Sequence, residues 1–177
     1  MPPVPALSVA IAAAATVEPM SSTGTRATVA LTTLGIRFVP HPYRHEAGST
    51  AYGLEAAAAL GVEPARVLKT LVAAVDERLV VAVVPVSTTL DLKALAAAAG
   101  AKRAALAEPA TAERRTGYMV GGISPLGQRS HLPLYLDTSA LAHPTVFVSG
   151  GRRGFDIELA PGDLLAATGG TTAPIAR

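Results

Sequence analysis

The chain has 177 residues, of which 50% are hydrophobic, 16% charged and 4% aromatic, a composition that fits one globular domain with an aliphatic core and excludes a disordered chain. It contains no cysteine, which excludes disulfides, thiolate-bound metals and a cysteine nucleophile. The net charge is +2, but the segment between Gly100 and Gly154 has a net charge of +4. This local excess suits a polyanion such as RNA. Arginines scattered over solvated faces would give the same local net charge.

Residues 1–21 precede the first periodic segment. The apolar stretch 6–17 is too short to span a bilayer, and it lacks the basic region of a secretory signal. We therefore expect residues 1–21 to be a poorly ordered, dispensable extension, residues 22–177 to be the functional domain, and the protein to be cytoplasmic.

The rest of the chain alternates between helix and strand patterns. Helices are predicted over 25–35, 51–61, 87–100, 108–117 and 161–169, and strands over 36–43, 67–75, 79–86, 101–107, 132–137, 145–151 and 155–160. Only "DER" separates the second and third strands, which indicates an antiparallel hairpin. Pro40 and Pro42 make the first strand an edge or bulged one. We expect an α+β fold with a mixed, largely antiparallel sheet or partly closed barrel surrounded by helices.

The predicted strand "VLKTLVAAV", residues 67–75, carries Lys69 and Thr70 in an otherwise apolar run. A lysine there must extend to solvent, pair with a carboxylate such as Asp156, or face a cavity in which its charge is used. The strand alone leaves these interpretations open.

Two glycine-rich segments, 116–128 and 148–161, place paired glycines at the ends of predicted elements. Their backbone N–H groups could converge on an anion or a carbonyl oxygen, although tight turns would require the same glycines. Neither segment has the spacing of a phosphate-binding P-loop or a dinucleotide fingerprint.

The motifs "VLKTLVA", "TGYMVGGISPLGQ" and "VSGGRRGFDIELAPGDLL", in this order, resemble the YbaK/EbsC family. That family is similar to the inserted editing domain of bacterial prolyl-tRNA synthetases, and the resemblance runs from about Thr25 to Leu165. It implies a deacylase of hydrolase or lyase type that removes cysteine from Cys-tRNA(Pro). The implied partners are aminoacyl-tRNA(Pro) and prolyl-tRNA synthetase, with no cofactor, no DNA and no membrane.

The resemblance also assigns candidate site residues. The expected catalytic residues are Lys69, Ser149, Gly150 and Gly151. The expected substrate-binding residues are Tyr43, Tyr52, Thr70, Gly121, Gly122, Ile123, Ser124, Pro125 and Asp156. Tyr52 stands where the family pattern has phenylalanine, a change that adds a hydroxyl to the pocket rim. With this resemblance, we favour the interpretation that Lys69 faces a cleft and holds the tRNA 3′ end or the developing oxyanion.

No serine–histidine–acid set is evident in the sequence. His41 and His45 flank Tyr43, but a strand with two prolines would not place both on one metal-binding face. We expect these two histidines, and His131 and His143, to be surface or hydrogen-bonding residues, and we expect no metal. The family resemblance implies a substrate-assisted route, in which the cysteine side chain attacks its own carbonyl.

Two alternatives stay open. One is a deacylase of the same class that acts on alanine or another small mischarged residue, which the pocket volume near Tyr52 would discriminate. The other is a non-catalytic module that binds tRNA or prolyl-tRNA synthetase; an intact Lys69 and paired glycine loops argue against it.

Overall fold

The computed structural model describes residues 24–177, so the predicted extension over residues 1–21 lies outside the described residues. The described helices are α1 (Arg26–Thr33), α2 (Tyr52–Leu60), α3 (Leu92–Ala98), α4 (Pro109–Thr116) and α5 (Pro161–Thr168), with short 3-10 turns η1 (Pro64–Arg66) and η2 (Thr138–Ala142). The described strands are β1 (Val39–Pro42), β2 (Leu68–Val75), β3 (Arg78–Pro85), β4 (Ala104–Leu106), β5 (Leu134–Asp137), β6 (Val146–Arg152), β7 (Phe155–Leu159) and β8 (Thr171–Ala173).

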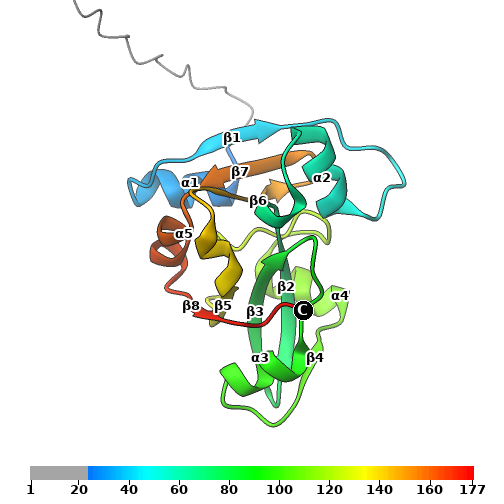
Figure 1. Ribbon diagram of the computed structural model, residues 1–177, viewed down its shortest axis with the longest axis vertical. Coiled ribbons are helices and arrows are strands. Elements are labelled where there is room, and N and C mark those ends of the chain that lie inside the picture. Colours follow the sequence, from blue (N-terminus) through cyan, green and yellow to red (C-terminus); the bar gives the residue numbers. More distant parts are fainter. Residues whose placement is uncertain (1–23) are drawn as a thin grey trace, which may run out of the picture.

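The strands form two sheets, which lie one above the other in Figure 1. The smaller sheet has the order β1-β7-β6, and the larger has the order β4-β2-β3-β5-β8. Only the β3–β5 and β5–β8 pairs are parallel among these strands. A single bridge between Val67 and Phe147 joins the two sheets. The predicted α+β fold with mixed, largely antiparallel pairing is confirmed, and the described strands do not close into a barrel.

The β2–β3 hairpin has a tighter turn than the sequence suggested. Arg78 pairs with Val75, so only Asp76 and Glu77 form the turn. Asp76 has φ 51°, a conformation that aspartate tolerates better than most residues. Its carboxylate accepts the backbone N–H of Lys102 at 3.1 and 3.2 Å, which anchors the segment leading into β4.

Local signals explain where several elements begin or end. Asp91 is the N-cap of α3, and its carboxylate accepts the backbone N–H of Ala94 at 3.0 Å. Gly61 closes α2 in the left-handed conformation. β1 lies at the edge of its sheet, as the prolines predicted, because a proline there removes no internal hydrogen bond.

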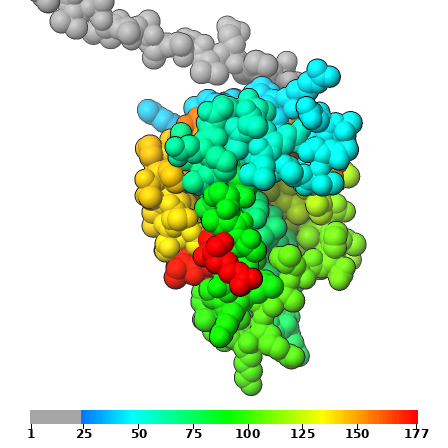
Figure 2. Space-filling model, turned by 45° about the vertical axis from the view of Figure 1, so that its right-hand side comes forward, coloured from blue at the N-terminus to red at the C-terminus, as the bar shows by residue number. Residues whose placement is uncertain are grey.

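Apolar side chains cover both faces of the larger sheet. Between the sheets lies a cluster that includes Leu31, Leu136 and Phe155, and on the opposite face α3 and the C-terminal segment bury Leu95 and Ile175. Figure 2 shows the C-terminal residues in red, seated against the segment around α3. None of the described helices combines the length and the apolar character that a bilayer crossing requires.

Candidate active site

In Figure 1, α2 lies above α4 and β4. Residues of these three elements, together with residues of β2, line a cavity of about 510 Å³. Polar and charged candidates from four separate elements meet in it. The predicted site residues that line the cavity are Tyr43, Tyr52, Lys69, Thr70, Gly121, Ile123, Ser149 and Asp156. The fold therefore brings together three motifs that lie far apart in the chain.

The other predicted site residues, Gly122, Ser124, Pro125, Gly150 and Gly151, do not line the cavity. Ser124 is fully buried, and its hydroxyl accepts the backbone N–H of Leu126 at 3.2 Å. A Cβ atom at Gly122 would lie 2.8 Å from Cα of Arg152, and one at Gly150 would lie 2.2 Å from the Phe155 ring. Gly122 and Gly150 therefore lie outside the cavity lining and let the loops pack closely.

The glycine loops also use part of their own donor capacity. The Gly151 N–H donates to Ser149 Oγ at 3.2 Å, and the Gly122 N–H donates to the Met119 carbonyl at 2.9 Å. In this conformation neither N–H points to a ligand in the cavity. Among the described basic side chains, Lys69 is the one that lines the cavity and could stabilise a developing negative charge.

The structure shows how the charge of Lys69 is accommodated in its apolar strand. Its ammonium is partly buried at the cavity and donates to the Thr88 carbonyl at 2.6 Å, and burial lowers its pKa. No described carboxylate lies within ion-pair distance of it, so the alternative of an ion pair with Asp156 is not formed. An ammonium has three protons, so donors remain for a substrate.

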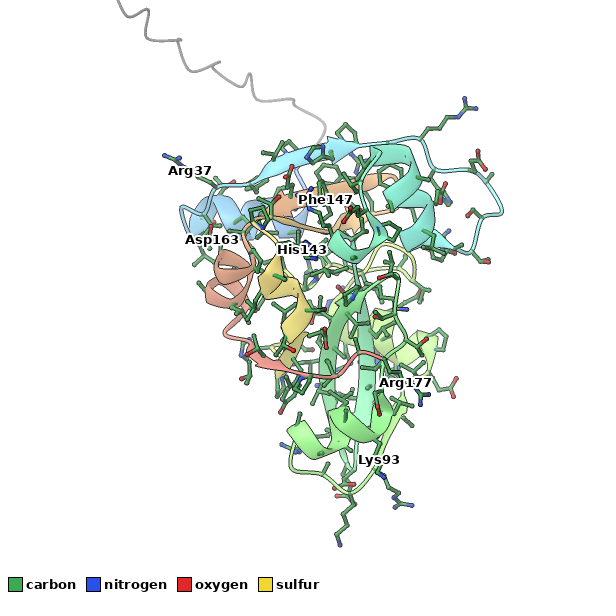
Figure 3. The ribbon with its side chains drawn as sticks, viewed as in Figure 1. Arg37, Lys93, His143, Phe147, Asp163 and Arg177 are labelled. Atoms are coloured by element: carbon green, nitrogen blue, oxygen red, sulfur yellow. The ribbon has the colours of Figure 1, made fainter. Side chains whose placement is uncertain are left out.

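The loop that holds Lys69 is fixed by the end of the chain. Thr89, next to the Thr88 acceptor, exchanges two backbone hydrogen bonds of 2.9 Å with Arg177. Figure 3 shows Arg177 lying over the larger sheet. The buried Asp137 carboxylate holds the same segment by accepting the backbone N–H of Ile175 at 2.8 Å. No local pattern in the sequence indicated this support.

Asp156 is the buried acid of the cavity. It lies on β7, the central strand of the smaller sheet, in register with His41 on one side and Ser149 on the other. Its residue surface is 5% exposed, and burial raises its pKa to about 7. Burial, and next the charge of Asp156, raise the pKa of Tyr43 to about 12, so this phenol keeps its proton. Asp156 is therefore placed to exchange a proton near neutral pH.

We expect Asp156→Asn to remove a pH-dependent loss of stability. The folded-state pKa of Asp156, about 7, exceeds its ordinary value of 3.8, so its contribution to stability is complete below pH 3.8 and is lost as the pH rises through 7. Asparagine cannot ionise, so between pH 5 and 8 the variant should lose less free energy of unfolding than the wild type, by on the order of 3 kcal/mol. Denaturant titrations at both pH values measure this difference.

Asp163→Asn is the matched control, because Asp163 lies in the first turn of α5, away from the cavity (Figure 3). This variant should keep the wild-type pH dependence. If Asp156→Asn also kept it, the assigned pKa of the buried acid would be wrong.

Two further side chains shape the cavity. Thr70 Oγ1 is buried and has no hydrogen-bond partner among the described residues, which leaves it available to a ligand. Tyr52 lies at the rim, with the Arg153 guanidinium 4.7 Å above its ring. Arg153 also donates to the Val120 carbonyl at 2.7 Å. This contact ties the turn after β6 to the glycine loop and to the start of α2.

The histidines behave as hydrogen-bonding residues. His41 Nε2 lies 2.7 Å from the Glu158 carboxylate and His45 Nδ1 lies 2.9 Å from that of Glu55, so the two rings serve different partners. Ser149 Oγ accepts from Gly151 and has no histidine partner. Among residues 24–177, no cluster of three or more potential metal ligands occurs. The described site therefore lacks a nucleophile–base pair of its own.

Sequence reasoning missed one wall of the cavity. The segment from β4 into α4 contributes Leu106, Ala107, Pro109 and Ala112. Its sequence gives only a short strand and a helix start, and nothing local indicates that the backbone N–H of Ala107 will bond to Val72 and bring this segment to the site.

Comparison with known proteins agrees with this geometry. The sequence pattern of the aminoacyl-tRNA editing domain matches residues 45–167. A protein of Enterococcus faecalis assigned as the Cys-tRNA(Pro)/Cys-tRNA(Cys) deacylase EbsC is 42% identical over 120 residues, which cover 67% of this chain and 73% of that protein.

Solved structures lead to the same group. The crystal structure of a protein described as a trans-editing enzyme for prolyl-tRNA synthetase superimposes with a TM-score of 0.76 at 30% identity, over 89% of this chain and 99% of that one. The structure of a hypothetical protein matches with a TM-score of 0.78 at 27% identity, over 86% of this chain and 100% of that one. With the editing-domain pattern covering most of its length, the chain belongs to the YbaK/EbsC family of aminoacyl-tRNA editing proteins.

Proposed function

We propose that the protein is a trans-editing deacylase that releases cysteine from mischarged Cys-tRNA(Pro). The observation that carries this proposal is a cavity with a lysine, a buried acid and an unpartnered hydroxyl, but with no nucleophile–base pair among the described residues. Such a site can position an ester and stabilise charge, and it suits a substrate that brings its own nucleophile.

In the proposed reaction the substrate thiol attacks its own ester carbonyl. The new C–S bond gives a tetrahedral oxyanion; the C–O bond to the terminal ribose then breaks, and the ribose oxygen leaves with a proton. Water opens the resulting four-membered thiolactone to give cysteine. In this proposal the ammonium of Lys69, which lines the cavity, stabilises the oxyanion. Asp156, with a pKa of about 7, takes the thiol proton and returns it to the leaving oxygen.

The partners follow from this chemistry. Aminoacyl-tRNA(Pro) is the substrate, and the activity belongs in the cytoplasm, where tRNA is charged. A deacylase that acts after synthesis must meet its substrate before the ribosome does, so we include prolyl-tRNA synthetase as a binding partner; the similarity to a trans-editing enzyme for that synthetase supports this.

The test is the release of labelled amino acid from tRNA(Pro) charged with cysteine, alanine or proline. We expect cysteine to be released fastest and proline to be retained, because only cysteine has an attacking thiol. Faster release of alanine would indicate a size-selective pocket that uses water. Tight tRNA binding without release would identify a non-catalytic module.

A further inference from the structure

The cavity is larger than an acyl subsite needs. Its volume of about 510 Å³ is in the range that holds a drug-sized ligand, whereas a cysteinyl side chain ends after one carbon and one sulfur. Among the polar lining groups, Asp156 is buried and Lys69 and Ser149 are partly buried, so they lie deeper than the exposed part of the lining. Space remains for a second, less polar portion of the substrate.

Two leucines line the cavity and are also exposed. Leu54, in α2, is 51% exposed, and Leu106, at the end of β4, is 57% exposed. Residues that both line the cavity and face solvent lie at its mouth. Exposed leucines do not by themselves indicate a ligand, but here two come from opposite walls and border one opening.

Both leucines are held by regular backbone structure. Leu54 lies within helix α2, whose next residue, Glu55, donates its N–H to the Ala51 carbonyl at 2.9 Å. Leu106 pairs with Ala73 in the larger sheet. The apolar mouth is therefore a preformed feature, which lowers the ordering cost of binding.

We propose that Leu54 and Leu106 form a subsite for the adenine of the terminal nucleoside of the aminoacyl-tRNA. This inference rests on the proposed function. In such a substrate only one ribose separates the acyl ester from the base, so an ester held near Lys69 and Asp156 places the base at the mouth. A nucleobase presents flat apolar faces, which aliphatic side chains can cover.

The charge at the rim fits the same occupant. Arg153, stacked on Tyr52, is exposed at the edge of the cavity. The phosphate that links the terminal nucleoside to the rest of the tRNA follows the ribose directly, and a guanidinium is suited to bind it. A protein partner seated on the two leucines would instead close the opening through which the ester enters.

The test measures binding without turnover. The probe is 3′-deoxyadenosine carrying cysteine through an amide at the 3′ position, which cannot be deacylated in the same way, and its affinity is measured by calorimetry. We expect Leu54→Ala/Leu106→Ala to weaken binding by about tenfold, because each truncation removes apolar surface that the base would cover. Leu141→Ala is the matched control, because Leu141 is 50% exposed and lies in η2, outside the cavity. It should bind like the wild type.

Further controls distinguish loss of the subsite from misfolding and from failure of the proposed function. Leu106→Met retains an apolar side chain and should retain most of the affinity, while thermal unfolding confirms that all variants are folded. Equal affinity of the wild type and the double variant would overturn the subsite. Wild-type binding that the double variant loses, without any cleavage of the corresponding 3′-O-cysteinyl adenosine ester by the wild type, would support the subsite and refute the deacylase.

Discussion

Lys69→Ala should lower the deacylation of Cys-tRNA(Pro) by about 100- to 1,000-fold, the usual cost of removing a donor to a developing oxyanion. The ammonium lies at the cavity in a partly dry environment, where a charge acts more strongly than in water. It forms no ion pair with a described carboxylate, and its one hydrogen bond goes to the Thr88 carbonyl. Single-turnover rates with Cys-tRNA(Pro) measure the loss.

The same variant should remain folded. Removing Lys69 leaves no buried partner charge uncompensated, so we expect the melting temperature to change by only a few degrees. Lys93→Ala is the matched control, because Lys93 is exposed on α3 and lies outside the site cavity (Figure 3). Its activity should equal that of the wild type. A loss of less than about tenfold in Lys69→Ala would contradict the catalytic role, and unfolding would show a structural one.

The position of Lys69 was predictable because its strand was. An apolar run as long as β2 forms a buried strand, and a hairpin of two such runs fixes the neighbouring strand as well. Burying a charge within that run is costly unless the charge faces a cavity or a partner. The charge of Lys69 in this strand therefore indicated a site from the sequence alone. The sequence left open whether Asp156 pairs with it, because that depends on how the smaller sheet packs against the larger.

For the glycines, the sequence could not distinguish residues that line the site from residues that allow close packing. A glycine needed for a ligand and a glycine needed for close packing have the same letter, and only the tertiary structure separates Gly121, which lines the cavity, from Gly122 and Gly150, which do not. Strand β8 was missed because Thr171–Ala173 has no apolar run of its own; it forms by parallel pairing with β5. Such long-range contacts leave no periodic signal in the sequence.

The largest effect that we expect lies in the substrate. With tRNA(Pro) as the common carrier, a seryl ester should be released at least about 100-fold more slowly than a cysteinyl ester, although the two side chains are nearly equal in size. A thiol with a pKa of about 8.5 supplies some thiolate at neutral pH, whereas an alcohol supplies essentially none. The described site has no nucleophile–base pair that would activate both esters alike.

The pH dependence of cysteine release is a second test of the thiol mechanism. If the thiolate is the nucleophile, the rate should rise about tenfold per pH unit well below 8.5 and level off above it. The thiol that is still protonated can react by a parallel route in which the Asp156 carboxylate takes its proton. This route should grow as Asp156, with its pKa of about 7, ionises between pH 6 and 8. In Asp156→Asn the rise should depend on the thiol alone.

Trapping the sulfur product separates this route from direct hydrolysis. Attack by the thiol forms a thiolactone before free cysteine appears, and a nucleophilic amine added in excess should capture it as a cysteinyl amide. Attack by water gives the free amino acid directly and gives no such adduct. Equal rates for seryl and cysteinyl esters, with no captured product, would mean that the cavity activates water and selects by size. The same enzyme would then be expected to deacylate Ala-tRNA(Pro), because nothing in that reaction requires a side-chain nucleophile.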